Sequence, residues 1–107
     1  MKVFGGSSKI QKLLEDERAL KATYNRVVAN KIYQRINELQ VADDLTEVAT
    51  IPPPRLHQLK GKRADQFSLD LTGNYRLIIK AYDENDDMTT DRGKAVAVEI
   101  VEVVDYH

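Results

Sequence analysis

Residues 55–82 read RLHQLKGKRADQFSLDLTGNYRLIIKAY, and this stretch decides the fold. Within it, Phe67, Leu69 and Leu71 alternate with other residues, as they do in a strand with one buried face. A second strand is expected over residues 75–82, where β-branched and aromatic side chains dominate. Two strands so close in the chain predict an antiparallel pair.

The turn between these strands carries Gly73 and Asn74, which tolerate positive φ and therefore predict a tight hairpin. A further strand is expected over residues 55–59. It begins after the prolines at 52–54, which cannot donate to a β-ladder and favour extended geometry before them. The whole stretch predicts an antiparallel meander with one apolar face and one basic face that carries His57.

Two helices are expected before the meander. Ser7 or Ser8 is a candidate N-cap for the first, in which Ile10, Leu13 and Leu14 form an apolar stripe.

The second helix is expected over residues 22–41. Its core stripe repeats at helical spacing and consists of Tyr24, Val28, Ile32, Ile36 and Leu39, with Val27 widening it. The other faces are expected to carry Arg26, Lys31 and Arg35, for which we favour a solvated helix face over contact with RNA or a partner.

The remaining segments complete a two-layer arrangement. A short strand is expected over residues 1–4, a helical turn over 45–48, and a long strand over 94–104. In the long strand the side chains expected to face the helices are Val96, Val98, Ile100, Glu102 and Val104, and Glu99 is left on the open face. The sequence predicts one domain over residues 1–107, an α+β fold with two N-terminal helices packed on one face of a mostly antiparallel sheet.

Composition limits the classes of function. The sequence has no cysteine, which excludes disulfides and thiolate catalysis. It has no apolar run of membrane-spanning length and no leader pattern, so we expect a cytoplasmic protein without a membrane partner. The net charge of -1 hides two basic blocks, residues 1–40 and 55–80, and an acidic block over 81–107. A polyanion could bind the basic face, with weak non-specific affinity.

The loop over residues 83–93 is strongly acidic and is expected to be a mobile hairpin loop. It lacks the central Gly and terminal Glu of a calcium-binding EF-hand loop. We therefore favour solubilising acidity over a metal site.

Both histidines of the chain, His57 and His107, are expected on or near the open face. The same face is expected to carry Lys60, Arg76, Asp105 and Tyr106. Metal-free RNA cleavage needs a general base, a general acid and cations that stabilise the phosphorane, and this set contains all three. We expect no metal or cofactor, because the two histidines lack the spacing of metal ligands.

Each of these residues also has a simpler interpretation. His57 could be an ordinary surface side chain, the terminal His107 could be frayed, and Arg76 could pair with Asp70 across the hairpin. Chemistry alone leaves these alternatives open.

Three motifs together resemble one family. They are RLHQLKG over residues 55–61, NYRLI over 74–78 and VDYH over 104–107, with QFSL at 66–69 between them. In order, spacing and terminal position they are similar to the HigB branch (plasmid maintenance system killer proteins) of the RelE/ParE toxin superfamily. The resemblance covers about residues 9–107 and is weak in the helices.

This resemblance implies a toxin that enters the ribosomal A site and cuts mRNA. It implies a HigA-like helix-turn-helix antitoxin as partner, and operator DNA contacted only through that antitoxin. By resemblance His57 and His107 transfer protons, Arg76 and Lys60 supply charge to the phosphate, Tyr106 positions a base or phosphate, and Asp105 supports them. The basic residues expected to contact nucleic acid are Arg55, Lys60, Lys62, Arg63 and Arg76.

Two features depart from the family pattern: the acidic hairpin after Tyr82 is longer than usual, and the pI near 6.1 is low. Two other functions also stay open. One is a ParE-like gyrase inhibitor, which does not need the histidines. The other is an inactive, antitoxin-bound co-repressor.

Overall fold

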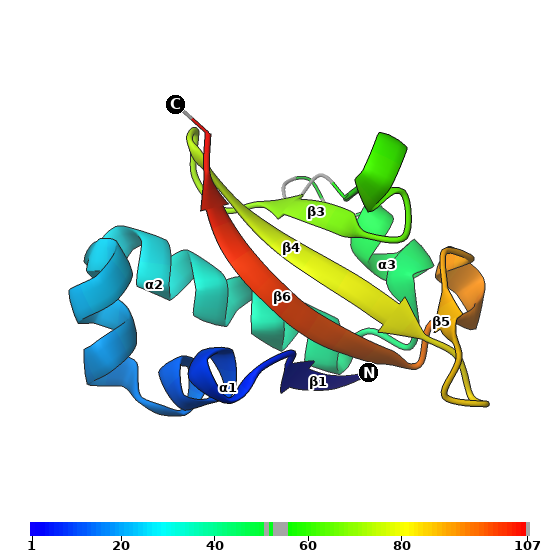
Figure 1. Cartoon of the computed structure of the whole chain (residues 1–107), viewed down its shortest axis with the longest axis horizontal. Coiled ribbons are helices and arrows are strands. Elements are labelled where there is room, and N and C mark those ends of the chain that lie inside the picture. The colour runs from blue at the N-terminus through cyan, green and yellow to red at the C-terminus, as the bar shows by residue number, and fades with distance from the viewer. Residues whose placement is uncertain (51, 53–55, 107) are drawn as a thin grey trace.

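The computed structural model describes residues 1–50, 52 and 56–106 and has an α+β fold (Figure 1). The helices are α1 (Ser8–Glu15), α2 (Glu17–Val41) and α3 (Leu45–Ala49), with 3₁₀ turns η1 (Gly61–Arg63) and η2 (Arg92–Lys94). The strands are β1 (Lys2–Gly5), β2 (His57–Gln58), β3 (Phe67–Asp70), β4 (Tyr75–Tyr82), β5 (Met88–Thr89) and β6 (Ala97–Asp105). The predicted fold class is confirmed.

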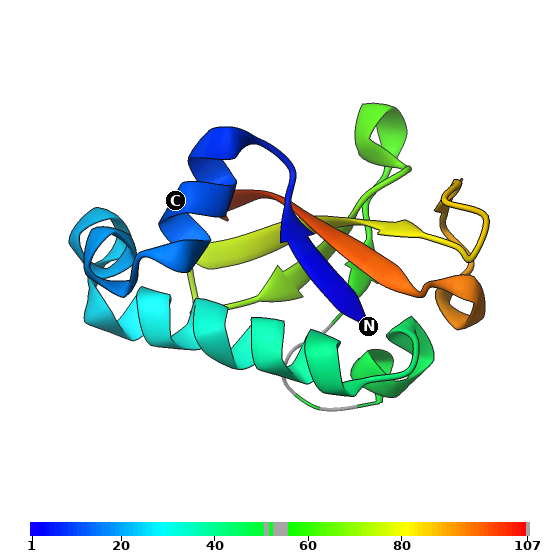
Figure 2. The same cartoon turned by 90° about the horizontal axis from the view of Figure 1, so that it is seen from below.

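The strands form one sheet in the order β1-β6-β4-β3-β2, and β5 pairs with β4 beside this path. β1 runs parallel to β6, and the other pairings are antiparallel. Figure 2 shows α2 along one face of the sheet and η1 rising on the opposite side. We call the face opposite α2 the open face.

The hydrophobic core lies between α2 and the sheet. From the sheet it receives Phe67, Leu69, Leu71, Leu77, Ile79, Val98 and Ile100, and from α2 and α3 it receives Leu20, Val28, Ala29, Ile32, Leu39, Leu45 and Val48. Ile10, Leu13 and Leu14 of α1 are partly buried against it. The predicted alternation of apolar residues at 67, 69 and 71 is confirmed, since all three side chains are buried in this core. Burying each of them is worth about 1.5–3 kcal/mol.

The second helix begins earlier than predicted and is interrupted. Asp16 caps it, because its side chain accepts a hydrogen bond from the Ala19 backbone N–H at 3.1 Å. Asn25 then breaks the helical path with φ 65° and ψ 168°, and its Oδ1 accepts from the Val28 N–H at 3.0 Å. Asn tolerates this left-handed φ better than most residues and is a strong N-cap. Val27 is consequently 64% exposed, so its predicted place in the core stripe is wrong.

Arg35 is buried, whereas the sequence placed it on an outer face of the helix. Its Nε donates to the Asp70 carbonyl oxygen at 2.7 Å, and its Nη1 donates to the Glu38 carboxylate at 3.1 Å. A buried guanidinium needs such partners to offset its lost hydration. Arg35 therefore ties α2 to the end of β3.

β6 contains a bulge that overturns half of its predicted alternation. Ile79 pairs with Ile100 and the adjacent Ile78 pairs with Glu102, so Val101 is the extra residue. An extra residue shifts every later side chain to the opposite face. Val98 and Ile100 face the core as predicted. Beyond the bulge the prediction is wrong: Val103 packs against the core, while Glu102 and Val104 lie on the open face.

Val96, also expected to face the helices, precedes β6 and is 45% exposed, so that prediction is wrong as well.

The turns follow the predicted positions with different geometry. The β3–β4 hairpin is confirmed, but neither Gly73 nor Asn74 has positive φ, and Gly61 in η1 does, at 64°. The helical turn near residue 45 is confirmed as α3, and the first strand is confirmed as β1. In the described part of the segment 55–59, only His57–Gln58 is a strand, and Arg55 lies outside the described residues.

Within the described part of the chain, no helix is both long and apolar enough to cross a membrane.

Candidate nucleic-acid interface

The strand register brings one row of side chains together on the open face. His57 pairs with Ser68, Ser68 pairs with Ile78, and Ile78 pairs with Glu102, across β2, β3, β4 and β6. Directly paired residues of antiparallel strands project from the same face. His57 is exposed at the β2 end of this row, and the half-buried Glu102 lies at the other end. Ser68 and Ile78 between them are buried.

The next row of paired residues on the open face runs from Asp70 through Arg76 to Val104. The Nε of Arg76 lies 2.9 Å from Asp70 Oδ1, so the cross-hairpin pair considered from the sequence is present. Its Nη1 donates to the carbonyl oxygens of Thr72 and Tyr75 at 2.8 and 2.9 Å. Its guanidinium carbon lies 6.0 Å from the centre of the Tyr106 ring, within cation–π range. Arg76 therefore fixes the hairpin turn and also presents a positive charge beside an exposed aromatic ring.

The end of β6 lies beside the start of β4. Asp105 pairs in register with Tyr75, and its negative charge raises the pKa of the Tyr75 hydroxyl. The Tyr106 N–H donates to the Asn74 carbonyl oxygen at 2.7 Å, which places the half-exposed Tyr106 ring near the turn. His107 lies outside the described residues. Tyr75 packs against the core, so its partner Asp105 projects toward the α2 side, and the prediction that Asp105 lies on the open face is wrong. The structure thus brings Tyr106, but not Asp105, to Arg76.

His57 and Arg76 share the open face but lie two strands apart. Neighbouring strands are about 4.8 Å apart, so two spacings separate them by about 10 Å along the hydrogen-bonding direction. They also differ by one step of two residues along β3, from Ser68 to Asp70. In this arrangement no contact joins the two side chains, and a ligand would have to span them.

The basic residues around η1 form a second group at the edge of the open face. Lys60 and Lys62 are exposed, and Arg63 is half-buried. The Nη2 of Arg63 lies 3.0 Å from Glu102 Oε1, and its Nε donates to Gln66 Oε1 at 2.8 Å. Sequence reasoning missed Glu102, because an uninterrupted alternation puts it on the core face.

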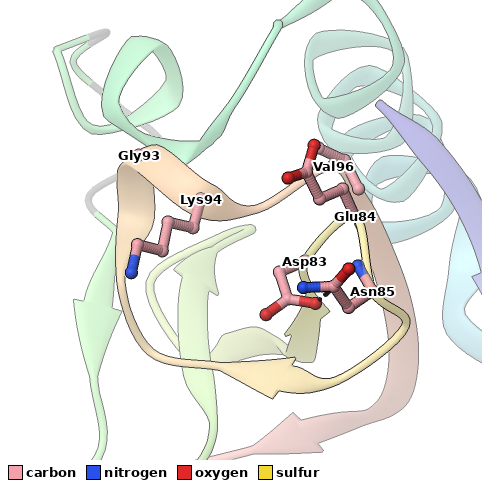
Figure 3. A pocket seen from close by; sticks show the side chains of 6 residues that line it. All are labelled: Asp83, Glu84, Asn85, Gly93, Lys94 and Val96. Atoms are coloured by element: carbon pink, nitrogen blue, oxygen red, sulfur yellow. Dashed lines mark hydrogen bonds between the residues drawn. The ribbon is translucent and has the colours of Figure 1, made fainter.

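The far end of β4 has the opposite charge. The Tyr82 hydroxyl donates to Glu99 Oε1 at 2.5 Å, and this hydrogen bond raises the pKa of Tyr82 to about 12. Beyond Tyr82 lies a cavity of about 350 Å³ lined by Asp83, Glu84, Asn85, Gly93, Lys94 and Val96 (Figure 3). It belongs to the acidic loop.

This loop is more ordered than the sequence indicates. Asp83 Oδ1 accepts hydrogen bonds from the backbone N–H groups of Asn85 and Asp87 at 2.9 and 3.1 Å. β5 then pairs with β4, and η2 follows. Among the described residues, no group of three or more His, Cys, Asp or Glu side chains is placed to hold a metal ion. The acidity of this loop is used, at least at Asp83, to cap its own turn.

Comparison with known proteins gives a fold class. No family model matches the sequence, and no curated protein matches it. The class shown by structure is the RelE/ParE-like α+β fold.

A solved structure with this fold is that of a YoeB/ParE toxin from Agrobacterium tumefaciens. It is similar to this chain with a TM-score of 0.62 and 13% sequence identity, and the match covers 100% of both chains. At this identity the likeness shows the fold alone.

Proposed function

We propose that this chain is the toxin of a type II toxin–antitoxin system and that it cleaves translated mRNA in the ribosomal A site. The observation that carries the proposal is the placement of His57, Arg76 and Tyr106 on one open sheet face. The full-length likeness to the structure of a YoeB/ParE toxin supports it. The sequence motifs around these three residues point to the same class.

The proposed chemistry uses the chain's own side chains. His57 and His107 transfer the protons, one taking the 2′-hydroxyl proton and the other protonating the leaving 5′-oxygen. Arg76 and Lys60 stabilise the charge that develops on the phosphate. The exposed Tyr106 ring offers a stacking surface for a base, and Asp105 supports the end of β6.

Arg76 suits this role because it is held in place before RNA arrives. Its Nε and Nη1 are engaged by Asp70 and by the turn carbonyls, so its charge needs no reorganisation in the reaction. The exposed Lys60 and Lys62 and the half-buried Arg63, with Arg55, would contact the RNA backbone.

The proposed partners follow from the same function. They are the ribosome and mRNA, and a HigA-like helix-turn-helix antitoxin through which the chain would reach operator DNA. The proposed place of action is the cytoplasm, where translation occurs.

A second candidate is inhibition of a topoisomerase, because the structurally similar toxin carries the name ParE as well as YoeB. This function does not require acid–base residues on the open face. Growth arrest by a toxin with intact transcripts would favour it. A co-repressor without toxicity is the third candidate, and its signature is DNA binding with the antitoxin but no growth arrest.

The test is to map mRNA 5′ ends after brief induction without antitoxin. Wild type should produce new ends within translated regions, and His57→Ala and His107→Ala should each remove them. Growth arrest that persists in the double variant with DNA-damage signalling would replace the nuclease with the gyrase inhibitor. Absence of growth arrest in wild type would leave the co-repressor.

A further inference from the structure

We propose that Glu102 is a built-in competitor for RNA: it holds Arg63 in an ion pair on the open face, and an RNA phosphodiester takes its place when RNA binds. The inference rests on the proposed function, because it assigns a regulatory contact to the same face. The proposal adds Glu102 to the candidate interface, and Glu102 lies outside the three sequence motifs.

The contact geometry defines how the exchange would work. Arg63 is anchored through its Nε to Gln66 Oε1 at 2.8 Å, while its Nη2 meets Glu102 Oε1 at 3.0 Å. The anchor keeps the guanidinium over the open face when its other partner leaves. Because the planar guanidinium binds carboxylate and phosphate with the same donors, one anion can substitute for the other.

The exposure of the pair allows the exchange. The Arg63 and Glu102 side chains are 40% and 43% exposed, so a ligand can reach both. An ion pair this exposed contributes little to stability, so opening it costs little. The pair of Arg76 with Asp70 differs, because its side chains are only 24% and 21% exposed and carbonyl oxygens also hold Arg76. Arg63 is therefore the more exchangeable of the two guanidinium groups.

The position of Glu102 depends on the bulge at Val101. Without that extra residue, Glu102 would project toward the helices. The bulge instead puts a carboxylate in the row that starts at His57, at the border of the basic face. Bulges commonly re-aim a side chain near a functional site, and here the redirected side chain is an anion among cations.

The test measures binding of a short single-stranded RNA to the purified chain by fluorescence anisotropy at low salt. Glu102→Gln removes the competing charge and should tighten binding about threefold, the scale of an exposed ion pair. The matched control is Asp65→Asn. It removes one carboxylate from a neighbouring, partly exposed pair, Lys80 Nζ to Asp65 Oδ2 at 3.9 Å, and leaves Arg63 and Glu102 unchanged. It should change affinity clearly less.

A second comparison shows whether the effect passes through Arg63. In an Arg63→Gln background, Glu102→Gln should give no further gain. Equal gains from Glu102→Gln and Asp65→Asn would reduce the effect to net charge and overturn the proposal. A full gain in the Arg63→Gln background would overturn it too, as would RNA binding by neither wild type nor Glu102→Gln.

Wild type provides a check that needs no variant of Glu102. In ¹H–¹⁵N spectra, the Arg63 Nε–H resonance should shift when this RNA is added, and an unchanged resonance under saturating RNA would contradict the exchange. Both measurements omit the ribosome. If transcripts are cleaved but Glu102 does not compete with RNA for Arg63, only the proposed role of Glu102 is wrong. If Glu102 competes with RNA but transcripts stay intact, only the proposed nuclease function is wrong.

Discussion

The two faces of the sheet are built from the same strands but by different means. On the face toward α2, Leu77 and Ile79 of β4 are fully buried among apolar side chains. On the open face, neighbouring residues of the same strand, Arg76 and Lys80, are held by ion pairs with partly exposed partners. Burial stabilises strongly and exposed ion pairs weakly. Ile78 lies on the open face and is also fully buried, so the contrast holds for the charged residues of that face and not for all of it. Stability should therefore depend mainly on buried apolar side chains, leaving Arg76 and Lys80 free to carry charge for a ligand.

The largest effect should come from a cavity on the core face. Leu77→Ala is expected to lower the free energy of unfolding by about 2–5 kcal/mol, because it removes fully buried atoms. Lys80→Ala, three residues on but on the open face, should cost no more than about 1 kcal/mol. Urea denaturation measures both. Similar losses for the two variants would erase the contrast between the faces.

Arg35 is the exception that sharpens the comparison, because it is a charge on the buried side. Arg35→Ala should destabilise by about 3 kcal/mol, since it leaves Glu38 and the Asp70 carbonyl without their buried partner. The exposed Arg26 on the same helix provides the control, and Arg26→Ala should change stability by less than about 0.5 kcal/mol. If Arg35→Ala were as mild as the control, Arg35 would not be the tie between α2 and β3.

Arg76 should give an intermediate effect on the open face. Arg76→Lys keeps the charge but loses the fork that reaches Asp70 and the turn carbonyls together, so we expect a loss of about 1–2 kcal/mol. The Tyr106 ring resonances should shift as well, because they lose the guanidinium nearby. Chemical denaturation and NMR test the two parts. Unchanged stability in Arg76→Lys would mean that charge alone matters at this position.

The smallest effect concerns titration at the acidic end of β4. The pKa of Tyr82 is raised to about 12 by its hydrogen bond to Glu99, above the usual value of about 10 in an unfolded chain. The stabilisation is therefore complete below about pH 10 and is lost as the pH rises toward 12. Absorbance titration of wild type against Tyr82→Phe isolates this group. Glu99→Gln should lower its pKa, and an unchanged titration would rule out Glu99 as the cause.

The sequence predicts the face of the sheet toward α2 well, because residues buried on one side of a strand or helix recur at a regular spacing in the sequence. Phe67 and Leu69 of β3 and Leu71 just after it alternate in the sequence, and all three are buried. The helical spacing of Val28, Ile32 and Leu39 marks the face of α2 that packs on the sheet. These patterns are local properties of one element. They need no knowledge of its neighbours.

The open face is harder to predict because its members depend on pairing between distant segments. The bulge at Val101 becomes visible only in the register of β6 against β4, and it decides that Glu102 meets Arg63. Asn25 is similar, since the residues around it continue a helical pattern. Motifs identified His57, Arg76 and Tyr106 as candidates, but not the carboxylate that neutralises a neighbouring cation.

The most direct test of the catalytic role of the open face is mRNA cleavage on programmed ribosomes, measured together with unfolding free energy for His57→Ala. Because His57 is exposed on the edge strand β2, its loss should leave stability within about 0.5 kcal/mol of wild type. Loss of a general acid or base should slow cleavage by about 10²–10⁴-fold. Cleavage at the wild-type rate by a folded His57→Ala variant would contradict the claim that the open face is the catalytic surface.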